Sequence, residues 1–138
     1  MSVGILIITH SNIGSSLYDA VISVIGSSPL PTKVLSVSLD SDPDVMVKKA
    51  KKIISDLDSG SGVLVLTDMY GSTPSNIACK LTNGRVNVVA GINLPMLVRV
   101  MNYPKLSLTQ LSQKAVSGGH EGVMPCQHGQ DINDKKTG

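Results

Sequence analysis

The chain has 138 residues, of which 41% are hydrophobic and 16% charged, a composition that suits one globular domain and excludes disorder over most of its length. No apolar run approaches the roughly 20 residues of a membrane helix, and the N-terminus lacks the basic stretch of a secretory signal, so we expect a cytoplasmic protein. The net charge is only +2 and the three aromatic residues are all tyrosines. We therefore expect neither a nucleic-acid partner nor a base-stacking surface.

Short apolar runs alternate along the chain with segments whose apolar residues recur at helical spacing. Residues 3–8 form a mostly β-branched run, which predicts a strand buried on both faces. From Ile13 the apolar residues follow one helix face, with Ser11 or Asn12 available as the N-cap. Asp42 followed by proline is typical of another helix start. The same reasoning predicts a helix over 13–25, strands over 33–39, 62–67 and 86–90, and helices starting near 43, 73, 95 and 107.

The alternation of strands with helices predicts an α/β fold, a parallel sheet covered on both faces by right-handed crossovers. Gly118 and Gly119 predict a flexible break. After it, residues 122–124 are expected to form a short antiparallel strand at the sheet edge. Residues 1–126 are expected to form the single domain, and the polar residues 127–138 a disordered tail.

Several polar or reactive side chains are expected to have no special role. The lysines at positions 48, 49, 51 and 52 fall largely opposite the apolar face of their helix, which favours a solvated surface. Cys79 and Cys126 lie far apart without a metal or redox spacing. They are expected to be a buried small side chain and a free thiol, respectively. His120 and His128 are expected to be solvated.

Two residues that follow predicted strands, His10 and Asp68, give the strongest indication of chemistry. Open parallel sheets bind ligands beyond the carboxyl ends of their strands, so a strand order of 2-1-3-4 brings both residues to one crevice, beside residues 91–93. A carboxylate there accepts a hydrogen bond from one imidazole nitrogen and leaves the other as a nucleophile. The structural alternatives are a loop histidine bound to a carbonyl and an aspartate that closes a turn.

The segment that follows the aspartate contributes a site for an anion. Gly71, Ser72 and Thr73 precede Pro74 at an expected helix start, where free backbone N–H groups attract anions. Imidazole, carboxylate and anion site together predict phosphoryl transfer through a phosphohistidine.

Cofactors and metals are not expected. The sequence has neither the G-x-x-x-x-G-K-[ST] motif nor G-x-G-x-x-G after the first strand, so no nucleotide cofactor is predicted. A metal site made of His10, Asp68 and His120 is disfavoured because no pair of ligands has the usual spacing.

Three segments resemble the IIA component of the mannose family of the bacterial phosphoenolpyruvate-dependent sugar phosphotransferase system. They are residues 5–10 (ILIITH), 67–76 (TDMYGSTPSN) and 90–97 (AGINLPML), and the resemblance extends over about residues 1–124. It implies a flavodoxin-like sheet of order 2-1-3-4 and a homodimer, with exchange of a C-terminal strand between subunits as one arrangement.

The resemblance also implies roles for individual residues. It places the family's phosphorylated histidine at His10 and its hydrogen-bonding aspartate at Asp68. Thr73 takes the place of the family's Ser/Thr. Ser72 stands where family members commonly have a second glycine, so its side chain could narrow the phosphate site or add a hydroxyl group to it.

The partners implied by the resemblance are HPr as phosphoryl donor and a IIB protein as acceptor. Because this chain holds no IIB domain, the acceptor is expected to be a separate protein, and contact with the membrane is expected only through a permease complex. A stand-alone regulatory IIA protein, whose phosphorylation state controls binding to a kinase or regulator, is the alternative function. Similarity to the phosphotransferase subunit of dihydroxyacetone kinase is weaker, because that relative lacks the G-x-[ST]-P segment.

Overall fold

The computed structural model describes residues 2–126, and four parallel strands form the centre of the molecule. They are β1 (Gly4–His10), β2 (Thr32–Val37), β3 (Val63–Thr67) and β4 (Val86–Ala90), in the order β2-β1-β3-β4. All five residues of the interior strand β3 are buried, as its unbroken apolar run predicts. The α/β class and the strand order predicted from the sequence are both confirmed.

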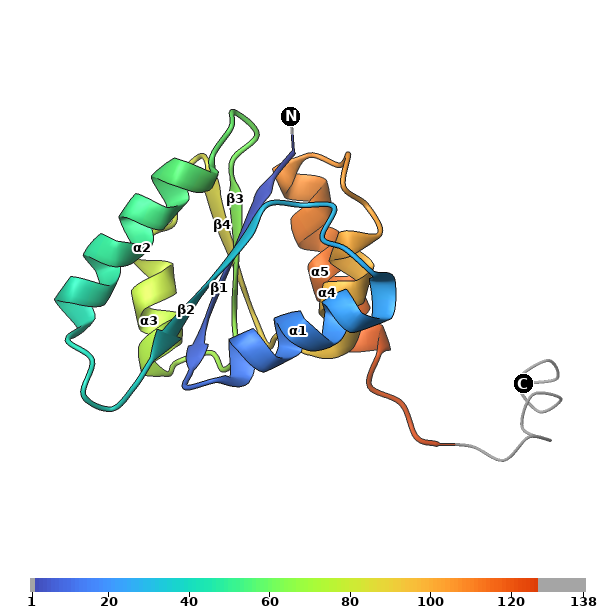
Figure 1. Ribbon diagram of the computed structural model, residues 1–138, viewed down its shortest axis with the longest axis horizontal. Coiled ribbons are helices and arrows are strands. Elements are labelled where there is room, and N and C mark those ends of the chain that lie inside the picture. The colour runs from blue at the N-terminus through green and yellow to red at the C-terminus, as the bar shows by residue number, and fades with distance from the viewer. Residues whose placement is uncertain (1, 127–138) are drawn as a thin grey trace, which may run out of the picture.

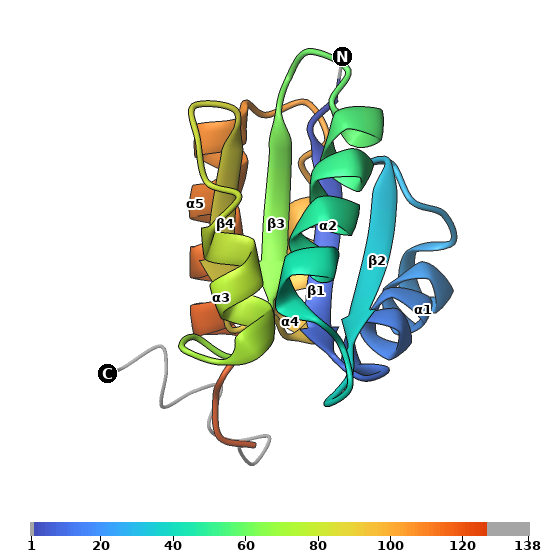
Figure 2. The same ribbon diagram turned by 90° about the vertical axis from the view of Figure 1, so that its left-hand side faces the viewer.

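Five helices cover the two faces of this sheet. They are α1 (Ile13–Ile25), α2 (Pro43–Leu57), α3 (Thr73–Cys79), α4 (Leu94–Met101) and α5 (Leu108–Glu121). Helices α2 and α3 pack on one face and α1, α4 and α5 on the other, as Figures 1 and 2 show. Two apolar layers result, one on each side of the sheet.

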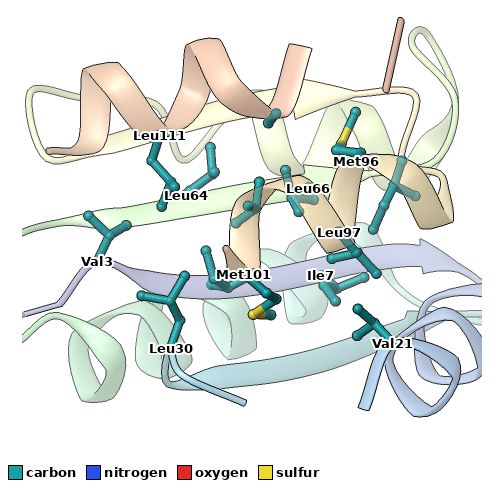
Figure 3. Packing of buried hydrophobic residues seen from close by; sticks show 14 residues of the cluster. Val3, Ile7, Val21, Leu30, Leu64, Leu66, Met96, Leu97, Met101 and Leu111 are labelled. Carbon is teal, nitrogen blue, oxygen red and sulfur yellow. The ribbon is translucent and has the colours of Figure 1, made fainter. Parts of the chain in front are cut away.

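Side-chain alternation in β1 decides which residues enter each layer. Ile7 points into the layer under α1, α4 and α5, which Figure 3 shows, whereas Leu6 and Ile8 point into the layer under α2 and α3. Because successive strand residues face opposite sides, Thr9 lies on the α1 side and His10 on the α2 and α3 side. The strand thus directs the histidine toward the start of α3.

Helix starts follow the capping residues of the sequence. The Asp42 side chain accepts a hydrogen bond from the backbone N–H of Asp44 at 2.9 Å, with proline at the start of α2. Ser107 and Gln110 form a reciprocal capping box at the start of α5. Both predicted starts are confirmed.

The C-terminal part differs from the prediction. Gly118 and Gly119 are not a flexible break but buried residues inside α5. A Cβ on Gly118 would lie 2.5 Å from the Cβ of Arg99, and one on Gly119 would lie 2.9 Å from the Cε of Met96. The two glycines therefore allow α5 to pack closely against α4. Residues 122–124 form no strand in the described chain.

The surface also corrects one expectation. Cys79 is exposed rather than buried, and both cysteines are free thiols. The lysines at positions 48, 49, 51 and 52 and His120 are exposed, as predicted. None of the helices within residues 2–126 is long and apolar enough to cross a membrane. The predicted disordered tail, with His128, lies outside the described residues.

Candidate functional site

His10 is the last residue of β1, and hydrogen bonds to three other segments hold the chain around it. Its backbone N–H donates to Asp68 Oδ2 at 3.0 Å, and the next N–H, of Ser11, donates to the carbonyl of Val37 at 2.9 Å. Behind it, the buried Thr9 Oγ1 accepts from the backbone N–H of Gly14 at 2.8 Å. These contacts join the end of β1 to β2, to the residue after β3 and to the first turn of α1.

The imidazole and the carboxylate meet as the strand order predicts. His10 Nδ1 lies 2.7 Å from Asp68 Oδ2, and the histidine side chain is 44% exposed against 12% for the aspartate. The other carboxylate oxygen accepts from the N–H of Met69 at 3.1 Å. In the described residues Nε2 of His10 has no hydrogen-bond partner. The contact therefore engages one ring nitrogen of His10, and the other has no hydrogen-bond partner within residues 2–126.

The carboxylate of Asp68 stays charged despite its partial burial. Burial is the largest single influence and raises its pKa, but it is outweighed by hydrogen bonds from the backbone and side chain of His10, a further backbone hydrogen bond and the charge interaction with His10, taken together. The pKa of Asp68 consequently lies below its ordinary value. A charged carboxylate next to Nδ1 favours the tautomer that carries its proton on Nδ1.

A pocket of about 370 Å³ opens beside the imidazole. It is lined by His10 at the end of β1 and Ser11 after it, and by Thr73 from the start of α3. Five further residues come from the end of β2, the β2–α2 connection and the first position of α2: Val37, Ser38, Leu39, Ser41 and Pro43. The pocket lies beyond the carboxyl ends of the strands, where ligands of open parallel sheets bind.

The residues of the predicted anion-binding segment differ in what they contact: two form a turn, and one lines the pocket. Ser72 donates both its backbone N–H and its hydroxyl to the carbonyl of Met69, at 3.2 and 2.6 Å. Gly71 adopts a left-handed conformation with a φ of 83°, which favours glycine. Thr73, in contrast, lines the pocket with His10. Gly71 and Ser72 thus shape the turn that presents Thr73.

The β2–α2 connection was missed as part of the site. The sequence predicts that the second strand continues to Leu39, but β2 ends at Val37. Ser38 and Ser41 close the connection through hydrogen bonds from the Ser38 backbone N–H and between their hydroxyls, at 3.0 and 3.1 Å. The signal present in the sequence was the S-x-D-S-D-P segment, typical of a turn before a helix cap.

Other candidate residues lie elsewhere. Asn93, after β4, accepts from the N–H of Met96 and donates to the carbonyl of Gly119, so it joins α4 to α5. His120 lines a different pocket, beside Val89. Over residues 2–126, no three His, Cys, Asp or Glu side chains are grouped to hold a metal ion.

This arrangement of an imidazole with one unpartnered nitrogen, a carboxylate at the other nitrogen and a pocket lined by Ser and Thr side chains is chemically suited to group transfer to an imidazole. Comparison with known proteins gives the family. The sequence model of the family described as "PTS system fructose IIA component" matches residues 4–116. The chain therefore belongs to this IIA family of the phosphotransferase system.

Individual relatives agree with this assignment. The "PTS system mannose-specific EIIAB component" of Escherichia coli (strain K12) is 33% identical over 84 residues, a match that spans 58% of this chain and 26% of that protein. The chain thus corresponds to about a quarter of that relative's length.

Solved structures share the fold. The mannose/sorbose-specific IIA subunit from Enterococcus faecalis superposes with a TM-score of 0.82 at 21% identity, covering 93% of this chain and 97% of that one. The PTS IIA protein associated with the fucose utilization operon of Streptococcus pneumoniae has a TM-score of 0.75 at 23% identity, with 99% of both chains covered. At these identities the likeness concerns the fold.

Proposed function

We propose that this IIA component carries phosphoryl groups on His10, accepting them from phospho-HPr and passing them to a IIB protein. The observation that carries the proposal is the 2.7 Å contact between His10 Nδ1 and Asp68 Oδ2. It orients the ring, holds the Nδ1 proton and leaves Nε2 as the nucleophile. We take residues 1–126 as one IIA-type domain.

The transfer is balanced without a further reactant. Neutral His10 attacks the phosphorus of the donor phosphohistidine through Nε2. A new N–P bond forms, the donor N–P bond breaks, and its electron pair stays on the donor imidazole. The Nδ1 proton remains between His10 and Asp68, whose negative charge stabilises the positive charge that the phosphorylated ring acquires. The same charge balance makes His10 a good leaving group in the next transfer.

The phosphoryl oxygens need hydrogen-bond donors in the pocket. Thr73 lines the pocket and would supply its hydroxyl there, while Gly71 and Ser72 form the turn before it. We propose that the backbone around Thr73 and its hydroxyl bind the transferred group, as positioning and charge stabilisation provide most of the catalysis in phosphoryl transfer.

Exposed apolar side chains near the histidine support protein partners over small substrates. Leu39 is fully exposed beside the pocket, and Met69 and Tyr70 are exposed in the loop after Asp68. Exposed apolar side chains that form a patch are typical of protein-interaction sites. HPr and IIB would dock in turn on this surface in the cytoplasm, and the membrane would be reached only through a permease complex.

Incubation with phosphoenolpyruvate, enzyme I and HPr tests this function. We expect an acid-labile, base-stable mass increase of one phosphoryl group that His10→Ala abolishes. The exposed His120 on α5 provides a matched control, and His120→Ala should react like the wild type. A His10→Ala protein that gains the phosphoryl group at the wild-type rate would contradict the assignment.

We further propose that the chain forms a homodimer in which its C-terminal segment covers the edge strand β4. A groove of about 460 Å³ runs beside β4 and α5, lined in part by Val89 and Val116, and Val116 is exposed. Val123 and Met124 are also exposed, and the segment after α5 leaves the body of the chain in Figure 1. Covering an edge strand removes an aggregation hazard, and exchange between subunits gives a closed dimer.

Two truncations test this dimer while leaving α5 intact. A chain that ends after Gly122 loses both exposed apolar residues and should dissociate at lower concentration. A chain that ends after Cys126 keeps them and should match the full chain in sedimentation equilibrium. Equal dimer stability of both truncations would place the interface elsewhere.

A further inference from the structure

Ser11, the residue after the histidine, has an unfavourable backbone conformation. Its φ is 43°, and it is the one non-glycine residue with a positive φ among residues 2–126. The left-handed region suits glycine and is costly for residues with a Cβ. Strain of this kind at a functional site is a reason to ask what the side chain contributes.

Ser11 does not cap α1, although the sequence offers it as a possible N-cap residue. Asn12 occupies the N-cap position of α1 and makes no side-chain cap hydrogen bond. The N–H of Gly14 is bound instead by Thr9 Oγ1 at 2.8 Å. The Ser11 hydroxyl itself has no hydrogen-bond partner in the described part of the chain.

The location of Ser11 indicates what its unpartnered hydroxyl could bind. Ser11 lines the same pocket as His10 and Thr73. The two other serines of the pocket, Ser38 and Ser41, bind each other. Ser11 and Thr73 therefore supply the two hydroxyls of the pocket without a partner within residues 2–126. They come from different connections, β1–α1 and β3–α3.

We propose that the Ser11 hydroxyl donates a hydrogen bond to a phosphoryl oxygen on His10 and is a further catalytic residue of the transfer. The inference rests on the proposed phosphorylation of His10. The hydroxyl takes no part in bond making, and its proton stays on Oγ throughout. Together with Thr73 it would hold the transferred group between two connections of the sheet.

Three serine variants separate the hydroxyl from the backbone. Ser11→Ala removes the hydroxyl and keeps the Cβ, whereas Ser11→Gly removes both and relieves the left-handed conformation. Ser16→Ala is the matched control, because Ser16 is exposed in the first turn of α1 and does not line the pocket. The rate of phosphoryl gain from phospho-HPr is measured by quenched intact-mass analysis, and thermal unfolding is followed in parallel.

We expect both Ser11 variants to react about tenfold more slowly, the loss of one hydrogen bond to a charged group, while Ser16→Ala matches the wild type. Ser11→Gly should nevertheless melt at or above the wild-type temperature. Wild-type rates in both Ser11 variants would overturn the proposal, and so would a loss in only one of them, which would indicate a backbone effect. Phosphorylation of His10→Ala would instead overturn the function on which the proposal rests.

Discussion

Replacing Asp68 by asparagine exchanges one carboxylate oxygen for an NH₂ group and removes the negative charge. The Asp68 carboxylate acts only as a hydrogen-bond acceptor in the described structure. Oδ2 accepts from the side chain and the backbone of His10, and Oδ1 accepts from the N–H of Met69. An asparagine has one acceptor and one donor group at these places. In either orientation, the NH₂ group therefore faces a backbone N–H.

The two orientations of Asp68→Asn have different chemical consequences. If the amide oxygen faces His10, the ring keeps its orientation but loses the charge that stabilises its phosphorylated form. If the NH₂ group faces His10, Nδ1 must accept, the proton moves to Nε2 and the nucleophile is lost. Hydrogen bonds to charged groups contribute about 1.5–3 kcal/mol, which corresponds to a roughly 10- to 150-fold slower transfer.

Rapid-quench measurement of phosphoryl gain from phospho-HPr, with thermal unfolding of the same samples, tests Asp68→Asn. We expect a fold that stays intact and a transfer rate lowered within the stated range. Because the pKa of Asp68 is below its ordinary value, its contribution to stability should be present above about pH 4 and lost as the pH falls further. Lower thermal stability at an unchanged transfer rate would mean that Asp68 only closes a turn.

Two further predictions concern the scaffold. Gly118→Ala should cost about 1–2 kcal/mol and lower the melting temperature, because overpacking against Arg99 outweighs the gain in helix propensity. Gly84→Ala, which adds a Cβ in open space, should leave the melting temperature unchanged, and equal effects of both variants would refute the close packing. Arg85 donates two hydrogen bonds of 2.8 Å to the Asp58 carboxylate. Together with backbone hydrogen bonds, they lower the pKa of Asp58. Arg85→Met should remove both hydrogen bonds from Arg85. The variant should be slightly less stable than the wild type at neutral pH. The difference should shrink as the pH falls below about 4, because the unfolded chain then binds a proton at Asp58 that the folded wild type does not; a constant difference in melting scans would contradict this.

The sequence predicts most of the fold because burial on both faces leaves unbroken apolar runs such as that of β3. It also predicts that His10 and Asp68 meet, since parallel topology brings strand ends together. Gly118 was misread because the contact with Arg99 is distant in sequence, and a glycine that permits helix packing looks like one that breaks a helix. The left-handed conformation of Ser11 was invisible because only glycine gives a clear signal for a positive φ in a sequence.

The site of phosphorylation is tested most directly by long-range proton–nitrogen NMR spectra of the nitrogen-15-labelled protein after reaction with phosphoenolpyruvate, enzyme I and HPr. The contact between His10 Nδ1 and Asp68 predicts that phosphorus couples to Nε2 of His10 while Nδ1 keeps its proton. His10→Ala should show no such signal. A phosphoryl group on Nδ1 of His10, or on any other residue, would contradict the account.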